Sequence, residues 1–285
     1  MYSNKDISIV INTFNSEDQI FSCLDKIDSD VKVIIVENSN NISFKKEVES
    51  KYSNVDCQLT NENLGYGKGN NLGLKKVKTK FALILNPDAK LKRNTLKNFF
   101  KTAANLNDFA IIGPGIQEKR DKSKIKLFKK DYIIQTENVK GFAMFLNLHQ
   151  FKNIGFFDEN FFIYFEEIDL CKRLIRENKK IFLDKGIEID HIGGSSHNSQ
   201  IDYEMELSRN WHWMWSTFYY HKKYNGFIFA LLKVSLKLTS SILKTIFYSI
   251  IKNKYKKNIY FQRYSGLINS IMGKKSWYRP KIFKN

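Results

Sequence analysis

The sequence predicts an α/β fold with a mainly parallel sheet, followed by a basic helical segment. Over the first 115 residues, short apolar runs alternate with helical patterns, and this alternation is typical of βαβ units. Polar residues follow several of the apolar runs directly, and ligands of such sheets bind at the carboxyl ends of the strands. Acidic residues end at Glu206, whereas Lys and Arg continue to the C-terminus. The charge pattern therefore separates a C-terminal extension from the rest.

The first strand and helix are indicated by an apolar run at 7–12, followed by Ser16 and, three residues later, Gln19. This spacing is the pattern of a capping box and predicts a helix to about residue 28. The same reasoning gives the other elements of this region. We expect strands at 31–37, 55–60, 81–85 and 110–115, and helices at 44–51, 66–76 and 95–104.

The pattern becomes less regular after Gly115. The charged stretch 117–131 predicts a solvated loop, with a role in covering a substrate as the alternative. We then expect a helix at 166–177 and short strands at 180–183 and 187–190. A domain boundary is placed at residue 205, so that 1–205 is the α/β domain and 206–285 a helical extension.

Composition excludes several classes of protein. Of the 285 residues, 42% are hydrophobic, which is enough for a core and excludes a disordered chain. The three cysteines Cys23, Cys57 and Cys171 are odd in number and widely spaced, which argues against a disulfide framework and against a Cys-based zinc site. The N-terminus lacks a signal-peptide pattern, so a cytoplasmic location is expected.

The net charge of +18 belongs mainly to the extension, because residues 207–285 contain 16 of the 47 basic residues and no acid. We expect an anionic partner, and a membrane surface before nucleic acid. At about 100° per residue, Lys233, Lys237 and Lys244 share one narrow stripe of a helix over 227–251. These three lysines interrupt the apolar sequence, and its longest uninterrupted run is much shorter than a membrane span requires. Both observations favour an interfacial helix over a membrane-spanning one. Packing of this helix on its own protein remains the alternative.

Trp211, Trp213 and Trp215 raise the possibility of a nucleic-acid-binding protein, because alternating aromatics resemble a stacking platform. They lie in a helical pattern, however, where core packing is the commoner use of Trp. We therefore expect no nucleic-acid partner.

Candidate ligand-binding residues follow three of the predicted strands. Thr13 and Asn15 follow the first strand, Glu37 ends the second, and Asn86 and Asp88 follow the strand at 81–85. Glu37 can accept a hydrogen bond from a base or a ribose. Asp88 can bind a hard divalent cation that bridges a diphosphate, with Asn86 as a further oxygen donor. Each of these patterns is also typical of an ordinary turn.

A glycine-rich segment spans 61–73 and contains Asn63, Gly65 and Asn71. Its glycine spacing differs from G-x-G-x-x-G and it follows the third strand, so a Rossmann dehydrogenase is excluded. A glycine-rich turn that enters a helix still suits a close approach to a nucleotide.

The run 155–173 is the most specific in the chain. Glu166, Glu167 and Asp169 lie within one helical turn among aromatic residues, which raises the pKa of a carboxyl group and favours a general base. Arg173 follows Asp169 by four residues, which suits an ion pair. His191 precedes a Gly-Gly-Ser-Ser loop, where a metal or phosphate contact is reasonable, although a lone His is usually structural.

In this order, the motifs resemble those of the family-2 inverting glycosyltransferases of GT-A fold, and in particular a rhamnosyltransferase-like branch that decorates surface polysaccharides. The resemblance covers about residues 6–200 and includes Gly141-Phe142-Ala143-Met144. It implies a nucleotide-diphospho-sugar transferase fold, which is a Rossmann-like mixed sheet flanked by helices. It also implies a UDP- or dTDP-sugar donor, a glycan or lipid-linked acceptor, and Mg²⁺ or Mn²⁺. From the basic helical extension, we expect a peripheral location on the inner face of the cytoplasmic membrane.

The resemblance also implies roles for individual residues. Asp88 is the principal metal ligand, and His191 assists the binding of the metal or of the diphosphate. Glu167 is the base that deprotonates the acceptor, as the second acid of the Glu166-Glu167 pair. The implied nucleoside-binding and pocket-lining residues are Thr13, Asn15, Glu37, Asn63, Gly65 and Asn71.

Two positions depart from the family's pattern, because Glu37 and Glu167 stand where Asp is usual. Each moves a carboxylate by one methylene, roughly 1.5 Å, which is enough to affect the rate of a reaction. A catalytically weak homologue that binds a nucleotide sugar therefore remains the alternative.

Overall fold

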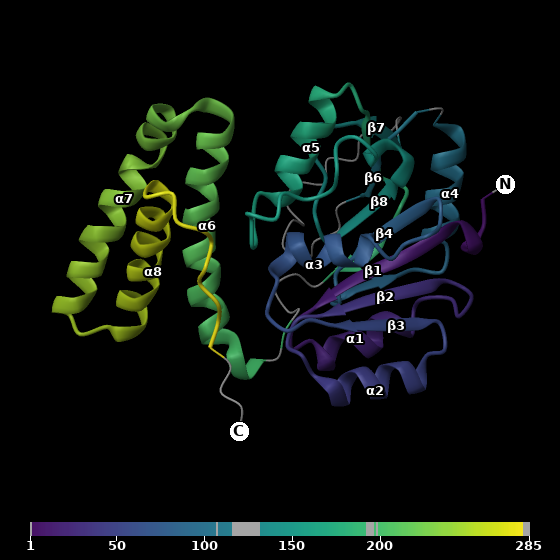
Figure 1. Cartoon of the computed structure of the whole chain (residues 1–285), viewed down its shortest axis with the longest axis horizontal. Coiled ribbons are helices and arrows are strands. Elements are labelled where there is room, and N and C mark those ends of the chain that lie inside the picture. The colour runs from purple at the N-terminus through teal and green to yellow at the C-terminus, as the bar shows by residue number, and fades with distance from the viewer. Residues whose placement is uncertain (1, 107, 116–131, 192–196, 198, 282–285) are drawn as a thin grey trace. The chain divides into compact units, whose positions relative to one another are not determined.

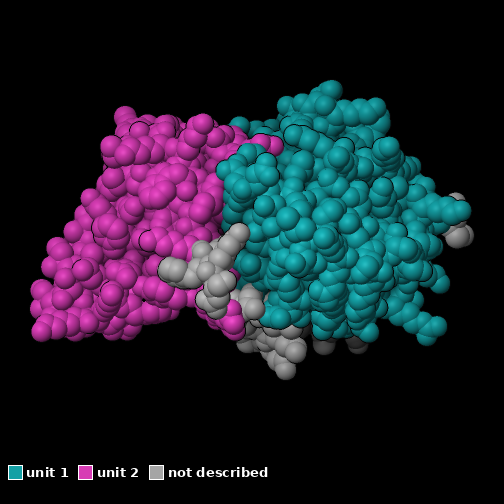
Figure 2. Space-filling model, turned by 60° about the horizontal axis from the view of Figure 1, so that its bottom comes forward, with its two compact units in different colours: residues 1–64, 68–157, 167–198 teal, residues 65–67, 158–166, 199–285 magenta. Residues whose placement is uncertain are grey.

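The computed structural model describes residues 2–106, 108–115, 132–191, 197 and 199–281. The chain forms two compact units, coloured separately in Figure 2. The first, here the sheet unit, contains residues 1–64, 68–157 and 167–198. The second, here the helical unit, contains residues 65–67, 158–166 and 199–285. The helical unit thus includes part of the 155–173 run as well as the C-terminal extension.

An eight-stranded mixed sheet forms the centre of the sheet unit, with the strand order β3-β2-β1-β4-β8-β6-β9-β7 (Figure 1). Strands β1 to β4 are parallel, β8 is antiparallel to both of its neighbours, and β7 is antiparallel to β9. The strands are β1 (Ile7–Thr13), β2 (Lys32–Glu37), β3 (Val55–Leu59), β4 (Phe81–Leu85), β6 (Ile111–Pro114), β7 (Ile133–Gln135), β8 (Ala143–Asn147) and β9 (Ile181–Asp184). A second sheet pairs β5 (Ala89–Leu91) with β10 (Ile189–His191).

Three helices cover one face of the large sheet: α1 (Glu17–Leu24), α2 (Ile42–Lys51) and α4 (Thr95–Asn105). Their apolar residues form one core cluster with alternate residues of β1, such as Ile7, Ile9 and Ile11, because successive side chains of a strand point to opposite faces. On the other face, a Cβ atom added to Gly73 of α3 (Gly65–Leu74) would lie 2.4 Å from Val10. Helix α5 (Glu166–Arg176) precedes β9, and short 3₁₀ turns span Asn4–Asp6, Leu148–Phe151 and Ser199–Ile201.

The structure confirms the expected α/β class and the expected order of strands and helices, with small changes at their ends. The expected capping box is wrong: Ser16 is the N-cap of α1 but makes no capping hydrogen bond, and its hydroxyl instead donates to the carbonyl of Phe14. Strands β5, β7 and β8 were not predicted. Strands β5 and β7 have only three residues each, which is too few to show a periodicity. The predicted loop at 117–131 lies outside the described residues.

Three helices form most of the helical unit: α6 (Asp202–Asn225), α7 (Phe227–Ile250) and α8 (Lys254–Ile271). Met214, Phe218, Ala230, Val234 and Leu267 form their shared core. A Cβ atom at Gly266 would lie 2.1 Å from the carbonyl oxygen of Trp211, so glycine allows α8 to approach α6 closely. In the described part of the chain, every helix is too short or too polar to cross a membrane.

Candidate active site

Strands β1 and β2 end at the same edge of the sheet because they are parallel, and their register pairs Thr13 with Glu37. Thr13 is buried and donates its hydroxyl to the carbonyl of Val36 over 3.4 Å. Asn15 follows in a left-handed conformation, with φ of 47°, and its backbone N–H donates to the hydroxyl of Ser39 over 3.4 Å. Thr13, Asn15 and Glu37 are therefore neighbours, as their predicted positions at strand ends required.

Glu37 is buried, and its carboxylate turns back onto the loop that follows β2. One oxygen accepts from the backbone N–H of Ser39 at 3.0 Å and also from the Ser39 hydroxyl. The other oxygen accepts from the backbone N–H of Asn41 at 2.8 Å. These bonds explain why a Glu suits this position. Its side chain is one methylene longer than that of Asp, so its carboxylate reaches the backbone N–H groups of the loop.

Asn38 links the ends of β1, β2 and the loop before α3, and sequence reasoning did not single it out. Its side-chain nitrogen donates to the side chain of Asn12 and, at 3.2 Å, to the carbonyl of Thr13. Its side-chain oxygen accepts from the backbone N–H of Leu64 at 3.0 Å. The sequence offered one sign of this role, an Asn directly after the acid that ends a strand. Only the fold shows that Asn38 is buried and that it connects β1 to the loop before α3.

The glycine-rich segment forms α3, and two of its glycines are needed for packing on the sheet. A Cβ atom at Gly69 would lie 2.6 Å from the side chain of Asn12, and one at Gly73 would lie 2.4 Å from Val10. Asn71 is buried and its side chain makes two hydrogen bonds with the backbone of Phe157, one of 2.9 Å and one of 3.0 Å. Asn63 precedes the helix, while Gly65 falls in the helical unit with φ of 76°.

Asp88 and His191 are brought together by the small sheet. Asp88 directly precedes β5, His191 ends β10, and Ala89 is paired with His191 in the antiparallel register. His191 Nε2 consequently lies 3.4 Å from Asp88 Oδ1. This distance permits an ion pair when the imidazole is protonated, but it does not form a hydrogen bond. The ring of His191 stacks on Phe142, with centroids 4.3 Å apart.

The residues at this position fit a divalent cation. Both carboxylate oxygens of Asp88 and both ring nitrogens of His191 are buried, and they lack hydrogen-bond partners within the described residues. Buried polar atoms are normally satisfied, so four unsatisfied ones side by side require an explanation. Carboxylate oxygen and imidazole nitrogen are suitable ligands for a first-row divalent ion. No larger group of His, Cys, Asp and Glu side chains occurs among the described residues, so further ligands would come from substrate or water.

The turn that presents Asp88 rests on buried groups. The backbone N–H of Asn86 donates to the carbonyl of Phe142 at 2.8 Å, which fixes the turn to the start of β8. On the other side, the Cys23 thiol lies 3.9 Å from the carbonyl oxygen of Asn86. Burial, assisted by the charge of Asp88, raises the pKa of Cys23 to about 12. The thiol is therefore an inert packing group. Cys23, Cys57 and Cys171 are all buried, and none forms a disulfide.

Glu166 and Glu167 begin α5, as the sequence predicted. Glu167 is half-buried, but its Oε2 is shielded from solvent and has no hydrogen-bond partner in the described chain. Burial raises its pKa, while the backbone N–H groups of Glu167 and Ile168 and the charge of Lys140 act in the opposite direction. A desolvated carboxylate at a helix N-terminus suits the role of a base.

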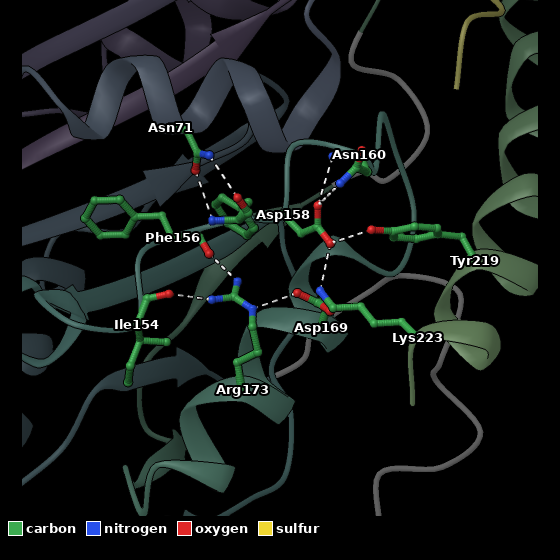
Figure 3. A network of polar contacts seen from close by, with 10 residues as sticks. Asn71, Ile154, Phe156, Asp158, Asn160, Asp169, Arg173, Tyr219 and Lys223 are labelled. Carbon is green, nitrogen blue, oxygen red and sulfur yellow. Dashed lines mark hydrogen bonds and ion pairs between the residues drawn. The ribbon is translucent and has the colours of Figure 1, made fainter. Parts of the chain in front are cut away.

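Asp169 makes the expected ion pair with Arg173, with 2.8 Å between the carboxylate and Nε (Figure 3). Asp169 is fully buried, and Arg173 also donates to the carbonyl of Ile154 at 2.9 Å and to that of Phe156. Arg173 therefore connects α5 to the backbone of residues 154–156. This arrangement fits a structural role for Asp169 beside Glu167.

A family model described as "Glycosyl transferase family 2" matches residues 8–171, which is more than half of the chain. The chain belongs to glycosyl transferase family 2. The matched residues include most of β1, the Asn86-Pro87-Asp88 turn and the start of α5, and thus most of the polar groups described above.

Two curated relatives support the family assignment. The chain is 26% identical over 198 residues to "Low-salt glycan biosynthesis hexosyltransferase Agl10" of Haloferax volcanii, and the match covers 62% of this chain and 64% of that protein. It thus spans less than two thirds of that relative's length. The chain is also 25% identical over 203 residues to "Rhamnosyltransferase WbbL" of Escherichia coli, covering 59% of this chain and 76% of the relative.

Solved structures share the fold. The mannosyltransferase PcManGT of Pyrobaculum calidifontis, in complex with GDP-Man and Mn²⁺, is similar with a TM-score of 0.59 at 12% identity, over 95% of this chain and 88% of that chain. Residues 1–349 of S. aureus TarS in complex with UDP give 0.55 at 13% identity, over 97% and 94%. These similarities confirm the GT-A fold expected from the sequence.

Proposed function

We propose that this chain transfers a sugar from a nucleotide-diphosphate donor, UDP- or dTDP-linked, to a hydroxyl group of a glycan or lipid-linked acceptor. The observation that carries the proposal is the buried Asp88–His191 pair at the carboxyl edge of the sheet, in a chain of glycosyl transferase family 2. Relatives described as a hexosyltransferase and a rhamnosyltransferase support a hexosyl or deoxyhexosyl donor. Surface polysaccharide synthesis is the proposed context.

In the proposed mechanism, Glu167 accepts the proton of the acceptor hydroxyl as its oxygen attacks the anomeric carbon. The bond from that carbon to the diphosphate breaks on the opposite side of the sugar ring, so the anomeric configuration inverts. The raised pKa of Glu167 makes its ionised form a stronger base than an exposed carboxylate. Thr13, Asn15 and Glu37 would contact the nucleoside, with Asn63, Gly65 and Asn71 lining its pocket.

Asp88 and His191 would hold Mg²⁺ or Mn²⁺, with Asn86 as a further oxygen donor. When bound, the ion neutralises negative charge on the departing diphosphate. The mannosyltransferase neighbour that carries GDP-Man and Mn²⁺ supports this assignment. The protein's contribution is a rigid position for the carboxylate, provided by the β5–β10 register and by the Phe142 ring.

A donor screen tests the proposal. The full chain is incubated with UDP-, dTDP- and GDP-sugars and with glycan or lipid-linked acceptors, with Mn²⁺ or with EDTA. Products are identified by mass spectrometry, and NMR of the purified product gives the anomeric configuration. We expect transfer with inversion from one class of donor in the presence of Mn²⁺. Donor binding without transfer to any acceptor would favour the catalytically weak homologue instead.

We further propose that the protein binds the cytoplasmic face of an anionic membrane through α7. One side of this helix exposes an apolar stripe made of Ile228, Leu232, Leu236, Leu243, Ile246 and Ile250, each at least 53% exposed. The opposite side packs on α6 and α8 through Ala230 and Val234. Exposed Lys233, Lys237 and Lys244 border the packed side, and Lys237 and Lys244 lie near the rings of Trp213 and Tyr260. An apolar stripe flanked by lysines suits the interface of an anionic bilayer.

Sedimentation with vesicles tests the membrane proposal. The full chain should sediment with phosphatidylglycerol vesicles at low salt more than with phosphatidylcholine vesicles. Leu236→Glu, within the stripe, should abolish sedimentation, whereas Gln262→Glu, which adds the same charge to α8, should reduce it only slightly. Equal sedimentation of the two variants would contradict a role for the stripe. The nucleic-acid alternative gains no support from Trp211 and Trp215, because both are buried.

A further inference from the structure

The segment 158–166, which leads into α5, has an unusual backbone. Tyr164 and Phe165 are consecutive aromatic residues, and both have φ of 71°, in the left-handed region. Bulky side chains rarely adopt this conformation, and such strain persists only where the surroundings impose it. The strained pair directly precedes Glu166 and Glu167. The direction in which α5 begins therefore depends on what holds this segment.

Helix α6 contacts the second half of the segment at several points. The hydroxyl of Ser216 donates to the carbonyl of Ile163 at 3.0 Å. His212 stacks on Phe162, with centroids 4.3 Å apart, and Trp213 meets Tyr164 edge-on at 5.3 Å.

The contact continues at the strained pair itself. The ring of Phe165 lies 5.5 Å from that of Trp213 and 5.2 Å from that of Tyr220. Trp213 thus contacts both strained residues, although it is 44% exposed, whereas Trp211 and Trp215 are buried.

The first residue of the segment is anchored to the end of α6 by charge. Asp158 accepts hydrogen bonds from Lys223 Nζ at 2.7 Å and from the Tyr219 hydroxyl at 3.1 Å (Figure 3). Burial disfavours the ionised form of Asp158, but the bonds from Lys223 and from the Asn160 backbone outweigh it, so the pKa of Asp158 is lowered. The side chains of Asp158 and Lys223 are only 14% and 28% exposed.

We propose that α6 is a positioning element of the active site, with Lys223 and Tyr219 as the anchor that fixes Asp158 and thereby the segment carrying Glu166 and Glu167. In this proposal, neither Lys223 nor Tyr219 contacts the substrate. The proposal rests on the proposed function, because it takes Glu167 to be the base. It assigns a role in the reaction to the C-terminal extension, separate from any role in membrane binding.

The test compares Lys223→Ala, Lys223→Arg and Tyr219→Phe with the control Lys222→Ala, whose lysine neighbours Lys223 but lies near the ring of Phe227 instead. With a soluble acceptor, Lys223→Ala should lower kcat about 10- to 100-fold and leave the donor KM within about twofold, because misplacing a catalytic group costs rate rather than binding. Lys223→Arg should restore most of the rate, and Tyr219→Phe should lower it only a few-fold.

Two further readouts separate positioning from general destabilisation. The acidic limb of the kcat/KM profile against pH should move in Lys223→Ala, since the surroundings of Glu167 change, and it should stay in place in Lys222→Ala. Hydrogen exchange of the amides at 161–167 should quicken in Lys223→Ala, with β1 unchanged. Faster exchange with an unchanged kcat would overturn the positioning role, as would a kcat loss without a change in exchange. Because exchange is measured without substrate, it remains informative even if no donor supports transfer.

Discussion

His191 Nε2 lies 3.4 Å from Asp88 Oδ1, although more than a hundred residues separate the two in the chain. Their proximity follows from one antiparallel register, in which Ala89 faces His191. Strands β5 and β10 have three residues each, so the periodicity of the sequence does not reveal that these two strands pair. This relationship turns an ordinary Asn-Pro-Asp turn into a candidate metal site.

The first prediction concerns this pair. Asp88→Asn should abolish Mn²⁺-dependent transfer and also remove the rise in Tm that Mn²⁺ causes in the wild-type protein with donor bound, since a ligand stabilises only the state that binds it. His191→Gln should weaken both effects. The measurement is a Mn²⁺ titration followed by differential scanning fluorimetry, with Asp190→Asn as control, because that neighbouring acid is exposed. An undiminished Tm shift in Asp88→Asn would refute the assignment.

The second prediction concerns the pH dependence of Glu167. Because burial raises its pKa, the acidic limb of kcat/KM should lie above the range of an exposed glutamate, and the rate should fall as pH drops through it. Glu167→Gln should lower kcat about 10²- to 10⁴-fold and remove this limb. If Glu166→Gln lowers kcat far more than Glu167→Gln does, the base is Glu166 and the assignment to Glu167 is wrong.

A stability measurement on the same variant follows from linkage. A raised carboxyl pKa means that the folded state favours the protonated form, so this contribution to stability is present at low pH and is lost as pH rises through the folded-state pKa. The Tm of Glu167→Gln relative to wild type should therefore be higher at pH 8 than at pH 4. A Tm difference independent of pH would argue against a desolvated carboxylate at this position.

The third prediction concerns Asn71, whose side chain bridges the backbone of Phe157. Asn71→Ala removes both of these buried hydrogen bonds, which should cost roughly 1–3 kcal/mol of unfolding free energy. Urea denaturation without donor measures this loss, and Asn61→Ala, at an exposed position before the same helix, is the control. A residue that only lines the donor pocket would instead change KM and leave the unfolding curve in place.

The fourth prediction concerns Glu37. Glu37→Asp draws the carboxylate back by one methylene, so it should lose its bond to the backbone N–H of Asn41, with a cost of about 1 kcal/mol. The donor KM should rise because the loop beside Thr13 is loosened. Glu47→Asp, on the exposed side of α2, serves as the control. Unchanged stability together with an unchanged donor KM would contradict this account of the Glu37 carboxylate.

Local interactions explain what could be predicted. The alternation of strands and helices up to residue 115, the position of α5 and the Asp169–Arg173 ion pair were all visible in the sequence. Each depends on residues a few positions apart, such as the i,i+4 spacing on one helix face. The placement of Thr13 and Glu37 beside each other also followed, because parallel strands end at the same edge.

The sequence by itself determined the α/β class, the family motifs and the carboxylates placed at strand and helix ends, because periodicity and turn chemistry are written in neighbouring residues. Only the tertiary structure decided that the β5–β10 register sets His191 beside Asp88, that β8 enters the sheet antiparallel between β4 and β6, and that α6 contacts the strained Tyr164–Phe165 pair. These relationships join segments far apart in the chain. Their energy comes from long-range packing and burial, which no local pattern of residues encodes.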